Sequence, residues 1–286
     1  LQLMGPLGIL ASTLQIALLQ SHLTSEQFMN WGWRVPFWVS LLLLIIAYYV
    51  RKSVEETPAF LELTKQGKTE SQLLNNFKDK EIRKRMLLLF LCVSSSGAIL
   101  FFCVQVYTAI FLKTSVRLDP ALVDKLSILA TCALLPLTVF CGWLSDLFGR
   151  KSVVLSGIIL GAVFIYPSFR MLEKLGITYI EIGSSSALLS IFGILVFLAI
   201  LLALVVGPQT ALLAEFFPAK NRNSAATVPH NLAAGWVGGL LPFIITWLNQ
   251  TIDSNLAGLW YPVIFLGIAG MIALRFFPET KSRNLL

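Results

Sequence analysis

Long apolar runs alternate with short polar segments along the whole of this chain of 286 residues. Each run approaches or exceeds the roughly 20 residues that cross a bilayer as an α-helix. The runs lack the strict alternation of apolar and polar residues that marks a half-buried β-strand. They cover residues 3–20, 35–50, 86–112, 126–145, 152–169, 186–217, 224–248 and 257–277. The pattern predicts an all-α integral membrane protein with eight transmembrane helices.

The composition and the placement of the bases support this interpretation. Hydrophobic residues make up 56% of the chain and charged residues 13%, whereas about 25% of the residues of a soluble protein are charged. A net charge of +7 could indicate a nucleic-acid partner, but 16 of the 22 Lys and Arg fall in segments 51–85, 150–151, 220–222 and 275–283. Bases gather on the cytoplasmic side of membrane proteins. We therefore expect the lipid bilayer, and no nucleic acid, as a partner, with both termini cytoplasmic.

One long polar segment divides the chain. Residues 51–85 carry nine bases and six acids and are the only candidate linker, between residues 1–50 and residues 86–286. A Glu-Thr pair follows the second span at Thr57 and the eighth span at Thr280. Six helices separate the two pairs, as in transporters built from parallel six-helix repeats, although two such pairs are equally consistent with chance.

A charged turn joins the fourth and fifth spans. Asp146 lies at the C-terminal end of a predicted helix, where the helix dipole disfavours negative charge. Arg150 and Lys151 follow within reach, and Gly149 supplies the positive φ that ends a helix. With Gly142 the spacing is Gly-x-x-x-Asp-x-x-Gly-Arg-Lys. The alternative is an ordinary tight turn with cytoplasmic bases.

A second acid repeats this arrangement after the sixth span. Glu215 lies at the end of a predicted helix, and Arg222 follows it on the same side of the membrane. A network of Asp146, Arg150, Glu215 and Arg222 would satisfy all four charges only while the helix ends are together, so it would favour one of two conformations. Solvation of four separate surface charges is the alternative.

The interiors of the spans contain few polar groups. No Asp, Glu, Lys or Arg lies near the middle of a span, although such residues usually form proton relays. His230 could carry a proton, but a hydrogen bond between helices is the favoured interpretation. The candidate substrate-binding residues are Gln105, Tyr107, Gln209, His230 and Asn231.

Neither a metal site nor an active site is indicated. The four cysteines lie in apolar runs without a Cys-x-x-Cys pair or a neighbouring His, so zinc and redox chemistry are not expected. An enzyme would need a nucleophile with its base, or clustered His, Asp and Glu, and the spans show none. We expect no catalytic residues and no cofactor.

The charged turn resembles the signature loop of the major facilitator superfamily, except that Leu147 stands where many members carry a base. Three further stretches resemble its metabolite:proton symporter branch, which includes carriers of proline and betaine, shikimate, α-ketoglutarate and citrate. They are Trp31-Gly32-Trp33-Arg34-Val35-Pro36-Phe37, the Gly207-Pro208-Gln209 region through Pro218, and Pro278-Glu279-Thr280-Lys281.

The resemblance implies the major facilitator fold, with the eight spans as helices five to twelve. Residues 1–50 would be the last two helices of the N-terminal bundle and residues 86–286 the complete six-helix C-terminal bundle. It also implies that the pair of Asp146 and Arg150 latches the cytoplasmic helix ends, and that the third and sixth spans line the central cavity.

From this resemblance we expect a secondary transporter in the bacterial inner membrane. It would carry a small polar or anionic metabolite with protons, by alternating access. The first four helices would be absent, so the chain would not transport alone and would need them as a partner. The alternatives are a non-transporting remnant or scaffold, a membrane enzyme and a channel; a channel would show a charged ring or filter-like sequence.

Overall fold

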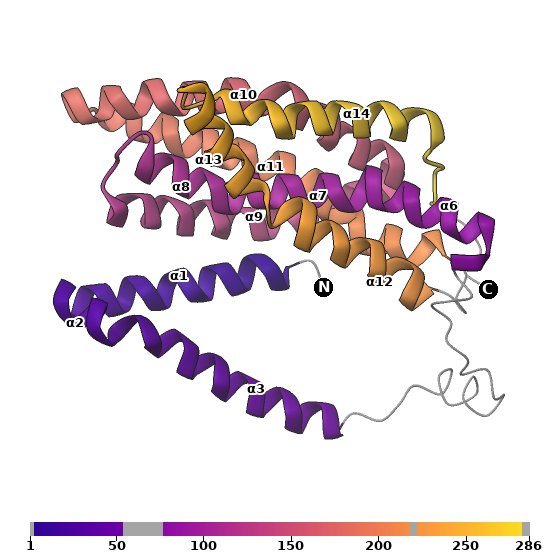
Figure 1. Ribbon diagram of the computed structural model, residues 1–286, viewed down its shortest axis with the longest axis horizontal. Coiled ribbons are helices and arrows are strands. Elements are labelled where there is room, and N and C mark those ends of the chain that lie inside the picture. The colour runs from indigo at the N-terminus through magenta and orange to yellow at the C-terminus, as the bar shows by residue number, and fades with distance from the viewer. Residues whose placement is uncertain (1–2, 54–76, 218–221, 282–286) are drawn as a thin grey trace.

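The computed structural model describes residues 3–53, 77–217 and 222–281 (Figure 1). Its helical elements are α1 (Met4–His22), α2 (Ser25–Asn30), η1 (Gly32–Arg34), α3 (Val35–Ser53), α6 (Lys80–Leu88), η2 (Leu89–Ser94), α7 (Ser95–Phe101), η3 (Phe102–Tyr107), α8 (Thr108–Thr114), α9 (Pro120–Phe148), α10 (Arg150–Ile182), α11 (Ser185–Phe216), α12 (Arg222–Leu232), η4 (Ala233–Gly238), α13 (Leu241–Ile252), η5 (Ala257–Leu259) and α14 (Trp260–Phe276). Among these residues, eight helical segments are long and apolar enough to cross a membrane. Each corresponds to one predicted span.

The first two spans form a pair at the edge of the molecule. Thr24 begins α2 with a capping box, in which its side chain accepts the N–H of Gln27 and Gln27 returns a hydrogen bond. This short helix reverses the chain between α1 and α3, which open as a V in Figure 1. Helix α1 packs against α9, whereas no residue in the most apolar stretch of α3 is buried. The apolar surface of α3 therefore fits a lipid environment rather than a protein core.

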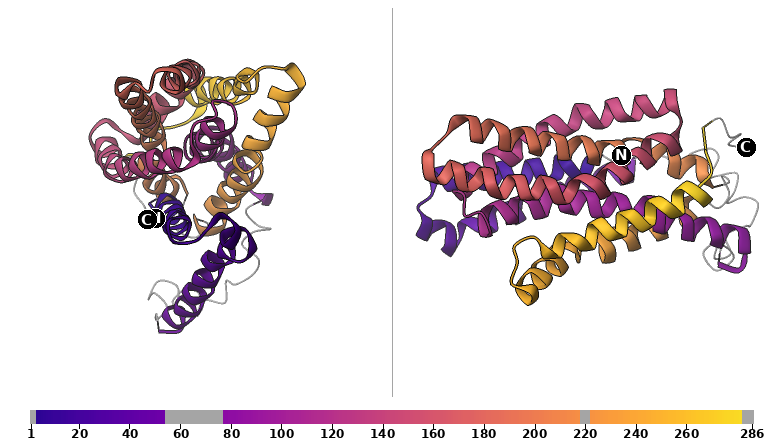
Figure 2. Two further views of the ribbon diagram at one scale, coloured as in Figure 1. Left: turned by 90° about the vertical axis from the view of Figure 1, so that its left-hand side faces the viewer. Right: turned by 90° about the horizontal axis from the view of Figure 1, so that it is seen from above.

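The other six spans form one bundle around α11. This helix packs against both α9 and α10, and α14 packs against α10; Figure 2 shows the bundle from its end and from above. Half of the most apolar stretch of α11 is buried. A helix that is apolar all round is suited to such a central position.

Several irregular turns interrupt the third and seventh spans. The π-helical turns η2 and η3 flank α7, and a third π-helical turn, η4, follows α12. Single π-helical turns of this kind are frequent at functional sites. The seventh span was predicted as one continuous run, but it divides at Gly239 and Leu240, just before α13 begins with Leu241 and Pro242. Proline lacks an N–H for the preceding turn, which accounts for a break at this position.

Several helices extend beyond their predicted spans. Helix α10 continues from the predicted end at residue 169 to Ile182, and the third span begins at Lys80, inside the predicted linker. Asp79 caps α6 by accepting the N–H groups of Glu81 and Ile82. Hydropathy detects only the part of a helix that lies in hydrocarbon, so capped polar ends were missed. The rest of the predicted linker, residues 54–76, lies outside the described residues.

Candidate functional site

Charged cluster and central cavity

Arg150 links three helix ends at one end of the bundle. It is the first residue of α10, and its guanidinium forms an ion pair with Asp146, near the end of α9. Its Nη2 lies 3.2 Å from Oε1 of Glu215, near the end of α11. Its Nη1 also donates to the Ser145 hydroxyl at 2.7 Å. The side chains of Arg150 and Glu215 are 12% and 17% exposed, whereas that of Asp146 is 57% exposed, so the pair with Glu215 is the more protected.

A segment after α14 adds a third carboxylate to this group. Glu279 accepts the backbone N–H groups of Arg150 and Lys151 at 2.9 and 3.1 Å, and those of Thr280 and Lys281 at 2.9 and 3.0 Å. The N–H groups of Arg150 and Lys151 lie in the first turn of α10, so they have no partner within the helix, and such groups attract negative charge. Thr280 is fully buried and donates its hydroxyl to Glu215 at 3.0 Å. We call Asp146, Arg150, Glu215 and Glu279 the charge cluster.

Neither Glu279 nor Thr280 was among the predicted site residues. The signal was present in the recurring Glu-Thr pair and in the preference of helix N-termini for anions. Arg150 and Glu279 are 129 positions apart in the chain, so their contact could not be predicted from the spacing of neighbouring residues.

Acid conditions are expected to weaken the attachment of Glu279. Burial alone would raise the pKa of its carboxyl, but four backbone N–H donors outweigh burial and lower the pKa below the usual 4.5. A carboxyl with a lowered folded-state pKa stabilises the protein above its unfolded pKa, and this stability is lost as the pH falls through the folded pKa. The thermal midpoint of the purified protein should therefore fall more steeply below about pH 4.5 than that of Glu279→Gln. Parallel pH curves for the two proteins would contradict this expectation.

Gly149 brings the chain from α9 into α10 beside Glu279. Its φ of +95° and ψ of 149° belong to a region that is essentially restricted to glycine. A Cβ there would lie 2.6 Å from Oε2 of Glu279. The positive φ predicted from the sequence is therefore found, and the turn also needs space for a carboxylate.

Gly149→Ala is expected to destabilise the protein more than Gly183→Ala. Both glycines have positive φ, but a Cβ at Gly183 would meet nothing within 4 Å. The control measures the cost of a side chain in the left-handed region, about 1–2 kcal/mol, whereas Gly149→Ala combines a less accessible backbone region with displacement of Glu279, for a total of about 3 kcal/mol. Thermal midpoints in detergent compare the two variants. Equal losses would show that the contact with Glu279 adds nothing.

The remaining residues of the predicted latch lie nearby but take other partners. Lys151 donates its ammonium to the carbonyl of Leu274 at 3.1 Å instead of to Asp146. Gly142 faces α11, where a Cβ on it would lie 3.5 Å from the carbonyl oxygen of Gly207. The side chain of Arg222 is outside the described residues, so its predicted place in the network remains a prediction.

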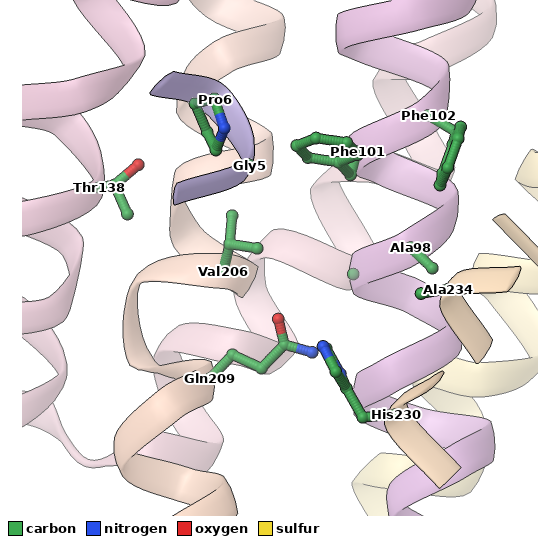
Figure 3. Close-up of a pocket in the computed structure, with 11 residues that line it drawn as sticks. Gly5, Pro6, Ala98, Phe101, Phe102, Thr138, Val206, Gln209, His230 and Ala234 are labelled. Atoms are coloured by element: carbon green, nitrogen blue, oxygen red, sulfur yellow. The ribbon is translucent and has the colours of Figure 1, made fainter. Parts of the chain in front are cut away.

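A cavity of about 290 Å³ lies deeper in the bundle (Figure 3). It is lined by Gly5, Pro6, Gly97, Ala98, Phe101, Phe102, Thr138, Val206, Gln209, His230 and Ala234. We call it the Gln209 cavity. Its walls come from α1, α7, η3, α9, α11, α12 and η4. The cavity therefore opens between the first span and the six-helix bundle.

Two polar side chains face each other across this mostly apolar space. Figure 3 shows the Gln209 amide and the His230 ring pointing toward one another. Gln209 is 1% exposed, and a Cβ on Gly97 would lie 3.2 Å from its amide. Gln209 Nε2 and His230 Nδ1 are buried and have no hydrogen-bond partner among the described residues. The predicted helix-to-helix hydrogen bond is therefore not formed by His230 Nδ1.

The other predicted substrate-binding residues do not line the Gln209 cavity. Gln105 accepts a hydrogen bond from Thr131 of α9 at 3.1 Å. Tyr107 accepts one from Asn249 at 3.0 Å, near the opposite end of the bundle. Asn231 is exposed on α12. The structure thus groups Gln209 with His230 and separates both from the other three.

A second cavity lies between the charge cluster and the Gln209 cavity. It has a volume of about 470 Å³ and is lined by Ser145, Asp146 and Arg150 of the charge cluster region, together with Thr138. Thr138 also lines the Gln209 cavity. The two cavities are therefore adjacent along α9, between the buried amide and the charged end of the bundle.

Comparison with known proteins

Among the described residues, eight apolar helices with a cavity beneath one charged end define a multi-pass helical membrane protein. The chain belongs to the family of sugar and other transporters, whose model matches residues 64–286. This confirms the membership of the major facilitator superfamily that the sequence motifs predicted, and members of this family are not enzymes.

The curated relatives are bacterial transport proteins. The chain is 31% identical to the inner membrane metabolite transport protein YhjE of Escherichia coli over 99% of its own length and 62% of the relative. It is 27% identical to the shikimate transporter of Escherichia coli, over 93% and 57%. It is 28% identical to the proline/betaine transporter of that organism, over 94% and 53%. The chain thus spans between half and two thirds of these relatives.

The fold is also found in a solved structure. The crystal structure of a D-xylose-proton symporter superposes with a TM-score of 0.60 and 21% identity, over 98% of this chain and 63% of the symporter. At this identity the comparison supports the major facilitator fold, which was predicted from the sequence.

Proposed function

We propose that the protein is a secondary transporter that carries a small polar or anionic metabolite with protons across a bacterial inner membrane. The pair of unpartnered nitrogen atoms, Gln209 Nε2 and His230 Nδ1, is the observation that supports this function. A buried polar group without a partner costs about 1–3 kcal/mol. A polar ligand in the Gln209 cavity would supply the missing hydrogen bonds and offset that cost.

The cavity favours a small ligand that also carries apolar surface. Its volume of about 290 Å³ lies at the lower end of the roughly 300–1,000 Å³ that ligand pockets occupy. Phe101 and Phe102 supply aromatic surface, and Gln209 can donate two hydrogen bonds. Metabolites such as those named for the relatives, shikimate, proline and betaine, form the first panel to test.

His230 is our candidate for the proton-coupled group. It is the one titratable side chain among the described residues that line the cavity, and its unpartnered Nδ1 can accept a proton or a hydrogen bond. Protonation of the imidazole would add a positive charge beside a bound anion and so favour joint binding. Exchange of this proton between the two sides of the membrane would couple transport to the gradient.

The charge cluster is our candidate for a latch between conformations. Arg150 links the ends of α9, α10 and α11 through its ion pairs with Asp146 and Glu215. Glu279 attaches the segment after α14 by accepting the backbone N–H of Arg150. These contacts require the helix ends to be adjacent. In alternating access, one bundle rocks against another around a central site. Because α9, α10 and α11 belong to the same bundle, the latch would respond to movements of these helices within that bundle, and their separation would break the cluster and open the second cavity.

Uptake by the protein in the form that its host expresses, reconstituted in proteoliposomes, tests the proposed function. We expect gradient-driven uptake of at least one labelled betaine, amino acid or carboxylate. His230→Gln should reduce the dependence on the proton gradient. Absence of uptake across the panel, with or without a gradient, would contradict the proposal.

We propose that both termini and the charge cluster face the cytoplasm. The bases concentrate at this end, as expected for cytoplasmic segments. Single cysteines at Lys80 and Ser254, in a background without the four native cysteines, should react from opposite sides of the membrane. Both positions are exposed at opposite ends of the bundle. Labelling of Lys80→Cys by an impermeant reagent added outside intact cells would reverse the proposed orientation.

A further inference from the structure

Three bases share one outward face of α6. Lys80, Arg83 and Lys84 are spaced at i, i+3 and i+4, so their side chains are neighbours on the helix surface, and all three are exposed. Leu87 continues the same face one turn further along and is 56% exposed. We call these four residues the basic face. An exposed leucine directly beside three bases gives this face a cationic part and an apolar part.

The opposite face of α6 fixes this orientation. Ile82, Met86 and Leu89 are buried in the core of the bundle, and α6 packs against α12 and η2. Figure 1 shows α6 at the end of the bundle where α12 begins and α14 ends. The helix cannot turn the basic face inward without exposing this apolar side, so the bases are held pointing away from the protein.

The apolar run of the third span starts at Met86, so we place the boundary of the hydrocarbon there and the basic face at the depth of the lipid headgroups. Arg85 Nη1 donates to the carbonyl of Phe216 at 3.4 Å, at the end of α11 beside Glu215 of the charge cluster. Lys80 precedes Arg85 by five residues, which places it about 7–8 Å further along the helix. The polar region on each side of the hydrocarbon is about 5–8 Å thick. The bases therefore reach the phosphates, while Leu87 lies toward the acyl chains.

The nearby acids do not neutralise these bases. Glu81 pairs with Arg85 at 3.1 Å, and Asp79 accepts the two N–H groups that begin α6. The two elements packed against α6, α12 and η2, contain no Asp or Glu. Among the described residues, Lys80, Arg83 and Lys84 form no ion pair with an acid. No described acid therefore balances the positive charge of these three bases.

We propose that the basic face binds the headgroup of an anionic phospholipid of the surrounding leaflet. The three bases would meet the lipid phosphate, and Leu87 would contact the upper acyl chain. A juxtamembrane cluster of bases is attracted to anionic lipid, and each added base strengthens binding. This interaction surface is separate from the Gln209 cavity, so it can be tested without knowing the transported metabolite.

Native mass spectrometry of the purified protein with added phosphatidylglycerol or phosphatidylcholine measures the interaction. We expect preferential retention of phosphatidylglycerol. The triple variant Lys80→Gln, Arg83→Gln, Lys84→Gln should weaken that retention by about 10–100-fold. Exposed substitutions on a helix that keeps its buried face should leave the fold intact, and the thermal midpoint verifies this.

Two controls separate the site from net charge. Lys125→Gln, Arg170→Gln, Lys174→Gln removes the same charge from exposed positions on α9 and α10 and should retain the lipid. The charge-conserving exchange Lys80→Arg, Arg83→Lys, Lys84→Arg should also retain it. Equal losses in both Gln triples, equal retention of the two lipids, or displacement of phosphatidylglycerol by inorganic phosphate alone would overturn the proposal.

Discussion

Replacing Arg150 with glutamine is expected to destabilise the protein by about 3 kcal/mol and to open the end of the bundle that holds the charge cluster. Arg150 pairs with two acids and donates to the Ser145 hydroxyl. The side chain of Glu215 is 17% exposed, so removal of the guanidinium leaves a largely buried carboxylate without its base. Removing one partner of a buried pair costs about 3–5 kcal/mol, and partial exposure places the expected value at the lower end.

Asp146→Asn is the matched control, because it removes the negative charge of the other acid that pairs with the Arg150 guanidinium. The Asp146 side chain is 57% exposed, and exposed ion pairs contribute about 0–1 kcal/mol. Opening is measured by alkylation of Thr210→Cys, which lines the second cavity, in a background without native cysteines. We expect faster alkylation and a lower thermal midpoint for Arg150→Gln than for Asp146→Asn. Equal effects would assign the cluster no more than the role of a charged turn.

The different contributions of Asp146 and Glu215 to stability could not be derived from the sequence. Asp146 and Arg150 are four residues apart, so their proximity follows from local spacing alone. Glu215 lies 65 residues beyond Arg150, and only the packing of α11 between α9 and α10 brings it beside the guanidinium. The sequence motif directed attention to Asp146, whereas burial makes Glu215 the more consequential partner.

Glu279 illustrates the same limit in a different way. Its four bonds are to backbone N–H groups, and backbone donors have no residue type that a sequence pattern could identify. Gly149 was easier to predict, since its position after a helix and before two bases indicated a positive φ. That it also leaves space for the carboxylate of Glu279 depends on the position of the segment after α14.

The fold itself was largely accessible from hydropathy, because each span must bury or expose an apolar surface along about 20 residues. Helix ends were less accessible. Helix α10 continues through Arg170 and Lys174, which lowered the local hydropathy without ending the helix. The irregular turns η2, η3 and η4 carry no comparable signal, since their residues are as apolar as those of the regular turns around them.

The polar residues inside the spans show what helical periodicity leaves open. Gln105 and Gln209 are both long amides in apolar runs, so both were candidates for substrate contact. In the structure Gln105 meets Thr131 between two helices, and Gln209 meets the cavity with its Nε2 unpartnered. Which face of a helix meets a cavity depends on its rotation within the bundle, and neighbouring helices set that rotation.

Gln209→Met is expected to reduce transport while leaving the protein equally stable or more stable. Methionine has nearly the shape of glutamine but lacks the amide, so the substitution removes an unpartnered buried donor without creating a large cavity. That removal should stabilise the protein by about 1–2 kcal/mol. Under the proposed function the amide donates to the metabolite, and its loss should raise the KM for uptake about tenfold or more.

Gln105→Met is the matched control, since it makes the same chemical change at an amide that already has a partner. Loss of the hydrogen bond from Thr131 should cost about 0.5–1.5 kcal/mol and leave KM within about twofold of the parent value. The two substitutions therefore shift stability in opposite directions, which a general effect of methionine in a membrane helix would not do. Thermal midpoints test this part without any substrate. If Gln209→Met instead lowered the midpoint and left uptake unchanged, the amide would have a structural partner, and the Gln209 cavity would be a gap in packing rather than a binding site.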